Sequence, residues 1–161
     1  WFKIYKPLEY YAAILTVRGE NMDAVTVLKG RNAVKRRMEE IKPKGKEASA
    51  KEKDQFTIMQ IASEMIARNV QLLPVDLYKS HATVYRIEDG KLRMPFVALS
   101  GVGENTAKSL YDAQNDGEGE FMAIDDIQRR SGASSAVITA LREVGALEGI
   151  PESMQTSLFG I

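Results

Sequence analysis

The sequence has no cysteine and a single histidine, His81, among its 161 residues. The absence of cysteine excludes disulfides and thiolate zinc sites. One histidine gives no histidine-based metal site, so we expect His81 to be a surface or hinge residue.

Long apolar runs are also missing. No segment approaches the roughly 18 apolar residues of a membrane span, and no signal peptide opens the chain. Hydrophobic residues make up 44% and charged residues 27%, which is ordinary for a globular protein. We expect a cytoplasmic protein without a membrane partner. The first residue is Trp1 instead of methionine, which we interpret as a cut inside a longer protein.

A net excess of either charge is absent as well, because 22 basic residues balance 22 acidic residues. Net charge therefore gives no argument for binding nucleic acid. The charges are unevenly distributed, however. Ten basic and four acidic residues lie between Lys29 and Lys53, whereas six acidic and no basic residues lie between Asp112 and Asp126. Five cations in the first segment either face phosphates or form a solvated helix face: Lys29, Arg31, Lys35, Arg36 and Arg37.

Helical patterns dominate the first part of the chain. Residues 7–19 predict a short buried helix that starts with proline. Residues 31–42 predict a basic amphipathic helix, which ends at Pro43. The Ser49–Glu52 spacing is that of a capping box, and a long amphipathic helix follows to about residue 69.

A short β-hairpin is predicted next. Residues 83–87 are β-branched and aromatic, and residues 91–94 form the return strand. Asp89-Gly90 between them is a turn signal, because both positions tolerate a positive φ. A further helical region extends from Pro95 to about Gly145, with loops at residues 115–120 and around Gly132.

These patterns predict a fold that is mainly α with a small β-hairpin. We divide the chain into an all-α unit (1–70), a unit of hairpin and helices (71–150) and a tail (151–161). The tail has no periodicity, so we expect it to be flexible.

The most informative segment is Phe96–Leu110, which has a helix-hairpin-helix pattern with Gly-x-Gly at its turn. The glycines let the backbone turn tightly and approach another surface. Free amides at the start of the next helix attract an anion, commonly a DNA phosphate, and Lys108 adds a charged contact. The alternative is a plain glycine turn between packed helices. The expected DNA-binding residues are Ser100, Gly101, Val102, Gly103, Asn105, Thr106 and Lys108.

A degenerate copy of this pattern lies 31 residues further on. Ser134 replaces the second glycine there, and with Ser135 it either binds phosphate or only caps the helix; the cap is the safer interpretation. Two copies matter because paired contacts can follow one duplex backbone without reading its sequence. Phe96, Gly101, Ala107 and Leu110 of the first copy correspond to Ile127, Gly132, Ile138 and Leu141 of the second. The expected DNA-binding residues of this copy are Gly132, Ser134 and Ser135.

The tail has two competing interpretations. It offers a glutamine amide and an apolar Leu-Phe anchor, which suit docking into a pocket on a partner, although five residues alone favour a chance match.

The pair Asp125 and Asp126 resembles part of a two-metal site. They stand at an expected helix start, however, where acidic residues favour the helix dipole, and we prefer that interpretation.

Four motifs occur in one order, Tyr10–Ala13, Val75–Ser80, Leu99–Glu104 and Leu141–Gly149. Together they resemble the C-terminal region of bacterial DNA polymerase III alpha subunits, over essentially the whole chain. The tail after Pro151 resembles the PolC type of these subunits, which many Gram-positive bacteria have. Several motifs in one order are specific, whereas none would be alone.

The resemblance implies that residues 1–70 end a fingers domain and that residues 71–150 are a duplex-binding tandem helix-hairpin-helix domain. It implies that the parent is a magnesium-dependent DNA-directed DNA polymerase whose catalytic aspartates lie upstream, so this chain would have no catalytic residue and no cofactor. The implied partners are duplex DNA, a sliding clamp and upstream domains of the same chain. Gln155, Ser157, Leu158 and Phe159 match the clamp-binding motif, while Thr156 departs from the more usual leucine.

Two alternatives come from other classes of protein. One is a non-enzymatic helix-hairpin-helix subunit that binds DNA in a repair or recombination complex. The other is a protein-interaction module that binds no DNA. The sequence that precedes Trp1 would discriminate between them, since a palm with paired aspartates there identifies a polymerase.

Overall fold

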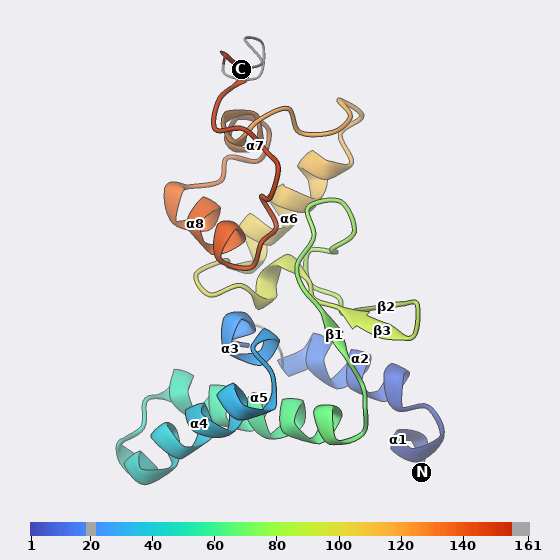
Figure 1. Cartoon of the computed structure of the whole chain (residues 1–161), viewed down its shortest axis with the longest axis vertical. Coiled ribbons are helices and arrows are strands. Elements are labelled where there is room, and N and C mark those ends of the chain that lie inside the picture. Colours follow the sequence, from blue (N-terminus) through green and yellow to red (C-terminus); the bar gives the residue numbers. More distant parts are fainter. Residues whose placement is uncertain (19–21, 156–161) are drawn as a thin grey trace.

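The computed structural model describes residues 1–18 and 22–155. The fold is mainly helical with one small sheet, which confirms the predicted fold class (Figure 1). Its α-helices are α1 (Phe2–Tyr5), α2 (Pro7–Arg18), α3 (Ala24–Leu28), α4 (Arg31–Ile41), α5 (Ala50–Ala67), α6 (Glu104–Gln114), α7 (Ile124–Ser131) and α8 (Ser135–Glu143). Two 3₁₀ helices, η2 (Lys42–Glu47) and η3 (Phe96–Ala98), join them, and the strands are β1 (Leu72–Leu73), β2 (Arg86–Glu88) and β3 (Lys91–Arg93).

Helices α4 and α5 pack against each other and are joined by η2. The predicted capping box is present at the start of α5, where the Ser49 side chain accepts from the Glu52 amide and the Glu52 carboxylate accepts from the Ser49 amide. Helix α4 ends as predicted, and Gly45 at φ 49° interrupts the helical backbone inside η2. The short helix α3 was not predicted, because five residues give too little periodicity to recognise.

The sheet has the order β1-β3-β2. Strands β2 and β3 form the predicted antiparallel hairpin, with Asp89 and Gly90 both at positive φ in its turn. Strand β1 pairs parallel to β3 and was not predicted, because two residues carry no alternation.

The prediction that the first strand begins at residue 83 was wrong. Strand β2 begins at Arg86. The amides of Thr83 and Val84 instead donate to His81 Nδ1, at 3.1 and 3.0 Å, and so form a turn. His81 is half-buried against the ring of Tyr111, with ring centroids 4.7 Å apart. The histidine therefore shapes the entry to the hairpin.

One cluster of buried apolar residues runs through both halves of the chain. It includes Tyr11 and Leu15 of α2, Leu92 of β3, Leu110 of α6 and Leu141 of α8. The proposed division into units at about residue 70 stays a prediction, and the two parts share this core.

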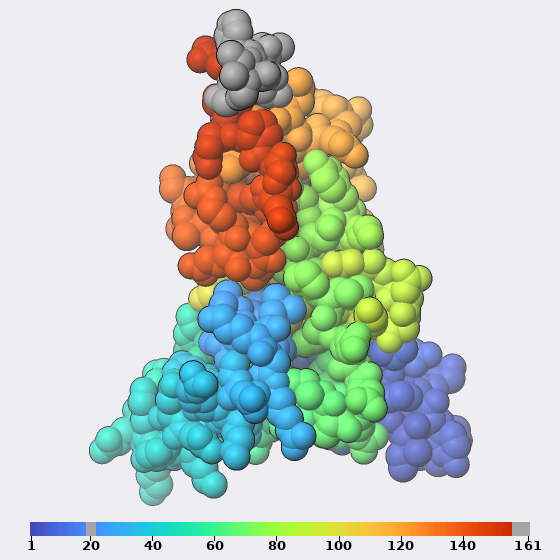
Figure 2. Space-filling view, viewed as in Figure 1, coloured from blue at the N-terminus to red at the C-terminus, as the bar shows by residue number. Residues whose placement is uncertain are grey.

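The molecule is elongated, and its charge is separated along the long axis. Figure 1 shows α4 and η2 at one end and the loop before α7 at the other. The basic segment Lys29–Lys53 and the acidic segment Asp112–Asp126 thus lie at opposite ends. Figure 2 shows that the surface over η2 protrudes from the body of the molecule.

The first residues of the predicted flexible tail are held against α7, which corrects the prediction. The amides of Ile124 and Asp125 donate to the carbonyls of Pro151 and Glu152, at 2.9 and 3.4 Å. The Met154 amide donates to Asp125 Oδ2 at 3.2 Å. Helix α7 has no side-chain cap, so this segment supplies partners for its first free amides.

Candidate functional site

The first hairpin consists of η3, the turn 99–103 and α6. Gly101 has φ 81°, a conformation that costs glycine little and other residues more. Val102 is buried, and its amide donates to the Leu99 carbonyl at 3.2 Å. Ser100, Gly101 and Gly103 are exposed on either side of it. The turn is therefore anchored at its centre and open at its surface.

The second hairpin consists of α7, the turn 132–134 and α8. Gly132 has φ 71°, and its amide donates to the Gln128 carbonyl at 2.8 Å, which closes α7. Ala133 is buried, whereas Gly132 and Ser134 are exposed. The same arrangement of an anchored centre and an open surface recurs.

The two turns have the same backbone at an offset of 31 residues. Gly101 and Gly132 both have positive φ. The N-cap Gly103 has φ −76° and ψ 170°, and the N-cap Ser134 has φ −74° and ψ 167°. The following helices start at equivalent positions, Glu104 and Ser135. The two turns therefore share these backbone angles and the position at which the next helix starts.

The helix starts differ in how their free amides are satisfied. At α6 no side chain of the described residues caps the helix. At α8 Ser134 Oγ accepts from the Val137 amide at 3.4 Å, which agrees with the preferred interpretation of Ser134 as a cap. Among the first-turn residues of the two helices, Asn105 and Ser135 are exposed and Thr106 is half-buried. Free amides at a helix start favour a bound anion, and the first turn of α8, unlike that of α6, contains no acidic residue.

Two of the expected DNA-binding residues have partners within the chain. Val102 is 4% exposed and its amide already has a partner, so it holds the turn in place and offers little to a ligand. Lys108 is exposed, but its ammonium pairs with Glu104 Oε1 at 2.7 Å. Glu104 also places a negative charge in the first turn of α6. This pair is exposed on both sides and holds Lys108 only weakly.

The backbone conformation at position 103 does not require a glycine. Its φ lies in a region that every residue adopts, and a Cβ there would meet no atom within 4 Å. Ser134 has the same backbone in the second copy. The glycine requirement in each hairpin lies instead at Gly101 and Gly132.

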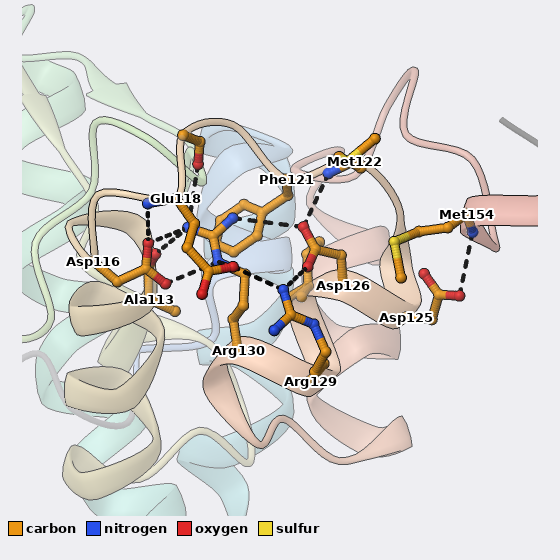
Figure 3. A network of polar contacts seen from close by, with 12 residues as sticks. Ala113, Asp116, Glu118, Phe121, Met122, Asp125, Asp126, Arg129, Arg130 and Met154 are labelled. Carbon is orange, nitrogen blue, oxygen red and sulfur yellow. Dashed lines mark hydrogen bonds and ion pairs between the residues drawn. The ribbon is translucent and has the colours of Figure 1, made fainter. Parts of the chain in front are cut away.

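A buried arginine supports the second hairpin (Figure 3). The Arg130 side chain is 1% exposed and donates to Asp116 Oδ2 at 2.9 Å and to the Ala113 carbonyl at 2.7 Å. Its guanidinium lies 4.4 Å from the centroid of the Phe121 ring. Arg130 thereby ties α7 to the end of α6 and to the loop between them.

Asp126 completes this network. Its carboxylate accepts from Arg129 at 2.7 Å, from the Met122 amide at 3.1 Å and from Arg130 at 3.5 Å. Burial alone would raise the pKa of Asp126, but these hydrogen bonds and the two guanidinium charges outweigh it and lower the pKa. Asp126 stands in the first turn of α7, as the helix-start interpretation predicted.

Sequence reasoning missed Arg130, because Arg129-Arg130 reads as a solvated pair. The available signal was the four-residue spacing between Asp126 and Arg130, which brings them together on a helix. It also missed Gln114, whose side-chain amide donates to the carbonyls of Leu77 and Ser80 and joins α6 to the preceding loop.

The predicted residues of the tail fall at or beyond the last described residue. Gln155 is exposed, and Ser157, Leu158 and Phe159 lie outside the described residues. Within residues 1–18 and 22–155, no three acidic or histidine side chains gather as a metal site. Over the same residues no helix has both the length and the apolar character of a membrane span.

Comparison with known proteins gives two findings. A family model described as "Helix-hairpin-helix motif" matches residues 69–157, which is more than half of the chain. The chain is also 44% identical over 160 residues to "DNA polymerase III PolC-type" of Clostridium perfringens, and 43% identical over 159 residues to the protein of that name from Halalkalibacterium halodurans. Both alignments cover 99% of this chain and 11% of the relative, so the chain spans about a tenth of the length of these curated relatives. With two hairpins of matching backbone inside the matched residues, the chain belongs to the helix-hairpin-helix family.

Proposed function

We propose that this chain is the part of a replicative DNA polymerase that grips duplex DNA, and that both hairpins contact backbone phosphates without reading the sequence. The observation that carries the proposal is the structural repeat, in which two exposed turns of the same backbone each lead into a helix start. Such a start favours an anion through its amides and dipole. The relatives named DNA polymerase III PolC-type support its assignment to a polymerase.

The proposed contacts use backbone amides and small side chains more than cations. Lys108 is the first basic residue in the sequence after the first turn. The first turn of α8 contains no acidic residue. Contacts of this kind fix the position of a duplex and carry no sequence information. They also release few counterions, so the hairpins alone should give a shallow dependence of affinity on salt.

The test is to put a negative charge at both N-caps without disturbing the helices. Aspartate is a preferred N-cap, so the double variant Gly103→Asp, Ser134→Asp should keep or raise stability. It should weaken duplex binding by about tenfold or more, because a carboxylate then stands where the phosphate would bind. Fluorescence anisotropy with labelled duplexes of unrelated sequence measures this effect.

A matched control places the same charges further along the same helices. Ser109→Asp, Thr139→Asp changes two exposed residues and should bind duplex nearly as the wild type does. If both double variants lost the same duplex affinity, the cause would be general charge repulsion and not a phosphate site at the N-caps. A strong preference for one duplex sequence would contradict the proposed mode of contact.

The enzymatic part of the proposal concerns a longer protein. We propose that the parent polymerase acts with magnesium in the cytoplasm and that its catalytic carboxylates lie outside this chain. Purified chain with magnesium should therefore not extend a primer. Robust extension by a clean preparation would contradict this assignment.

The proposed partner of the C-terminal residues is a sliding clamp. Gln155 would donate side-chain hydrogen bonds, and Leu158 and Phe159 would fill an apolar groove. The double variant Leu158→Ala, Phe159→Ala should lose several kcal/mol of clamp affinity, on a scale of roughly 2 kcal/mol or more for each anchor. Calorimetry with a matching clamp measures the loss, and circular dichroism checks the fold. Unchanged affinity would mean that the motif is a chance match.

A further inference from the structure

Helix α4 carries a line of cations on one side. Arg31, Lys35 and Lys42 are spaced four and seven residues apart, so they share one face, with about 6 Å and about 10 Å of rise between them. All three are exposed. Arg31 and Lys42 have no ion pair with any residue that the structure describes. Lys35 has Glu39 at 3.9 Å in a pair that solvent surrounds, which holds the lysine only weakly.

This basic stripe ends at a hollow between α4, η2 and α5. The hollow has a volume of about 310 Å³, at the lower end of the range for small-ligand sites. Ile41, Ala48 and Phe56 give it an apolar lining, and Lys42 and Lys53 line it as well. Gly45 also lines the hollow, and a Cβ there would meet no atom within 4 Å, so the turn adds no obstruction.

The carboxylates near the hollow do not cancel its charge. Glu52 is already bound by the Lys44 ammonium and the Ser49 amide, which together lower the pKa of Glu52 to about 2. Glu47 and Asp54 are exposed neighbours, but the whole segment Lys29–Asp54 keeps ten basic residues against five acidic ones. A negatively charged ligand is therefore favoured at this face.

We propose that this face binds single-stranded nucleic acid, with phosphates along Arg31, Lys35 and Lys42 and an unpaired base in the hollow against Phe56. Cations that track a backbone beside an aromatic ring are the features of single-strand sites. The line of three cations along one face suits a polymer with many charges better than it suits a single acidic anchor. The inference rests on the proposed function for its ligand class, but it uses other residues than the hairpins.

The basic face on α4 and η2 and the two hairpins would bind different parts of the same nucleic acid. The hairpin turns offer amides and few cations, whereas α4 and η2 offer cations at the far end of the molecule from the acidic loop (Figures 1 and 2). A duplex held at the hairpins and a strand that continues past its end would meet chemically different surfaces.

The test uses the whole chain and three labelled probes: a thymidine oligonucleotide, a blunt duplex and the duplex with a single-stranded overhang. Arg31→Gln, Lys42→Gln should weaken oligonucleotide binding about tenfold and reduce the slope of log affinity against log salt by about 1.4, since each lost phosphate contact removes about 0.7. Phe56→Leu keeps an apolar side chain and should weaken it at least about fivefold through lost stacking. Neither variant should change blunt-duplex binding by more than about twofold.

Matched controls separate this proposal from general charge effects and from the hairpin site. Lys6→Gln, Lys91→Gln removes the same charge elsewhere and should leave oligonucleotide binding nearly unchanged. The N-cap variant Gly103→Asp, Ser134→Asp should weaken blunt-duplex binding while the oligonucleotide still binds. The inference would be overturned if Arg31→Gln, Lys42→Gln and Phe56→Leu both bound the oligonucleotide with wild-type affinity. Poly-glutamate that displaces the oligonucleotide equally from wild type and Phe56→Leu would also overturn it, in favour of an acidic protein partner.

Discussion

The two hairpins have the same turn, but different interactions hold it in place. The first rests on apolar packing, since Phe96, Val97 and Ala98 of η3 are all buried. The second also rests on buried apolar residues, Ile124 and Ile127 of α7, and adds the Arg130–Asp126 pair. Both turns contain a positive-φ glycine and an extended N-cap. The support beneath the turn is thus apolar in the first hairpin and both apolar and ionic in the second.

The largest effect should come from removing Arg130. Arg130→Met removes a buried guanidinium that bonds Asp116, Asp126 and the Ala113 carbonyl, and breaking a buried charged network from one side costs about 3–5 kcal/mol. Urea unfolding should show this loss in the free energy of unfolding. Arg129→Gln is the matched control, because Arg129 is 56% exposed and should cost less than about 1 kcal/mol. If Arg130→Met and Arg129→Gln lowered the free energy of unfolding equally, the buried arginine would not be a special support of the second hairpin.

Acid should weaken the second hairpin, though less than the loss of Arg130, because a protonated carboxyl still forms hydrogen bonds. The pKa of Asp126 is lowered on folding, so its contribution is complete above the unfolded pKa of about 3.9 and disappears as pH falls through the folded pKa. The melting temperature should therefore drop between about pH 4 and the acid limit, and less so in Asp126→Asn. An identical acid dependence in both proteins would assign the drop to other carboxylates.

Replacing a glycine should cost more stability at the positive-φ position of each turn than at the N-cap Gly103. Gly101→Ala and Gly132→Ala force alanine into a positive φ and should each cost about 1–2 kcal/mol. Gly103→Ala has an ordinary φ and free space, and should cost less than about 0.5 kcal/mol. Thermal unfolding of the three variants measures this order. A cost at Gly103 as large as that at Gly101 would mean that the two turns differ in backbone.

The smallest effects should come from exchanging the caps. Ser134→Ala should cost about 0.5–1 kcal/mol, since the bond to the Val137 amide is long at 3.4 Å. Gly103→Ser should gain a few tenths of a kcal/mol by giving the first hairpin the cap of the second. Chemical denaturation of both variants measures the changes. A destabilising Gly103→Ser would show that the helix starts are not equivalent.

The sequence predicted what local patterns encode. The capping box at Ser49, the turn at Asp89-Gly90 and the 31-residue offset between Gly101 and Gly132 all depend on a few neighbouring residues, and the structure has each of them. The α4 boundary was predicted for the same reason, since Pro43 follows directly.

Features that depend on distant partners escaped prediction. Arg130 is buried because Asp116 and Phe121 come to it from the preceding loop. Residues 151–154 look featureless but are held by the free amides of α7, about 30 residues earlier. No periodicity within a segment reveals such contacts, because both partners are polar and lie far apart in the chain.

The most direct test of the central claim is an NMR titration of the isotope-labelled chain with a blunt duplex. If both hairpins contact phosphates, the first-turn amides of α6 (Asn105 and Thr106) and of α8 (Ser135 and Ala136) should shift together along one binding curve. Perturbations at one helix start only, or with different midpoints, would contradict the joint grip by two equivalent turns.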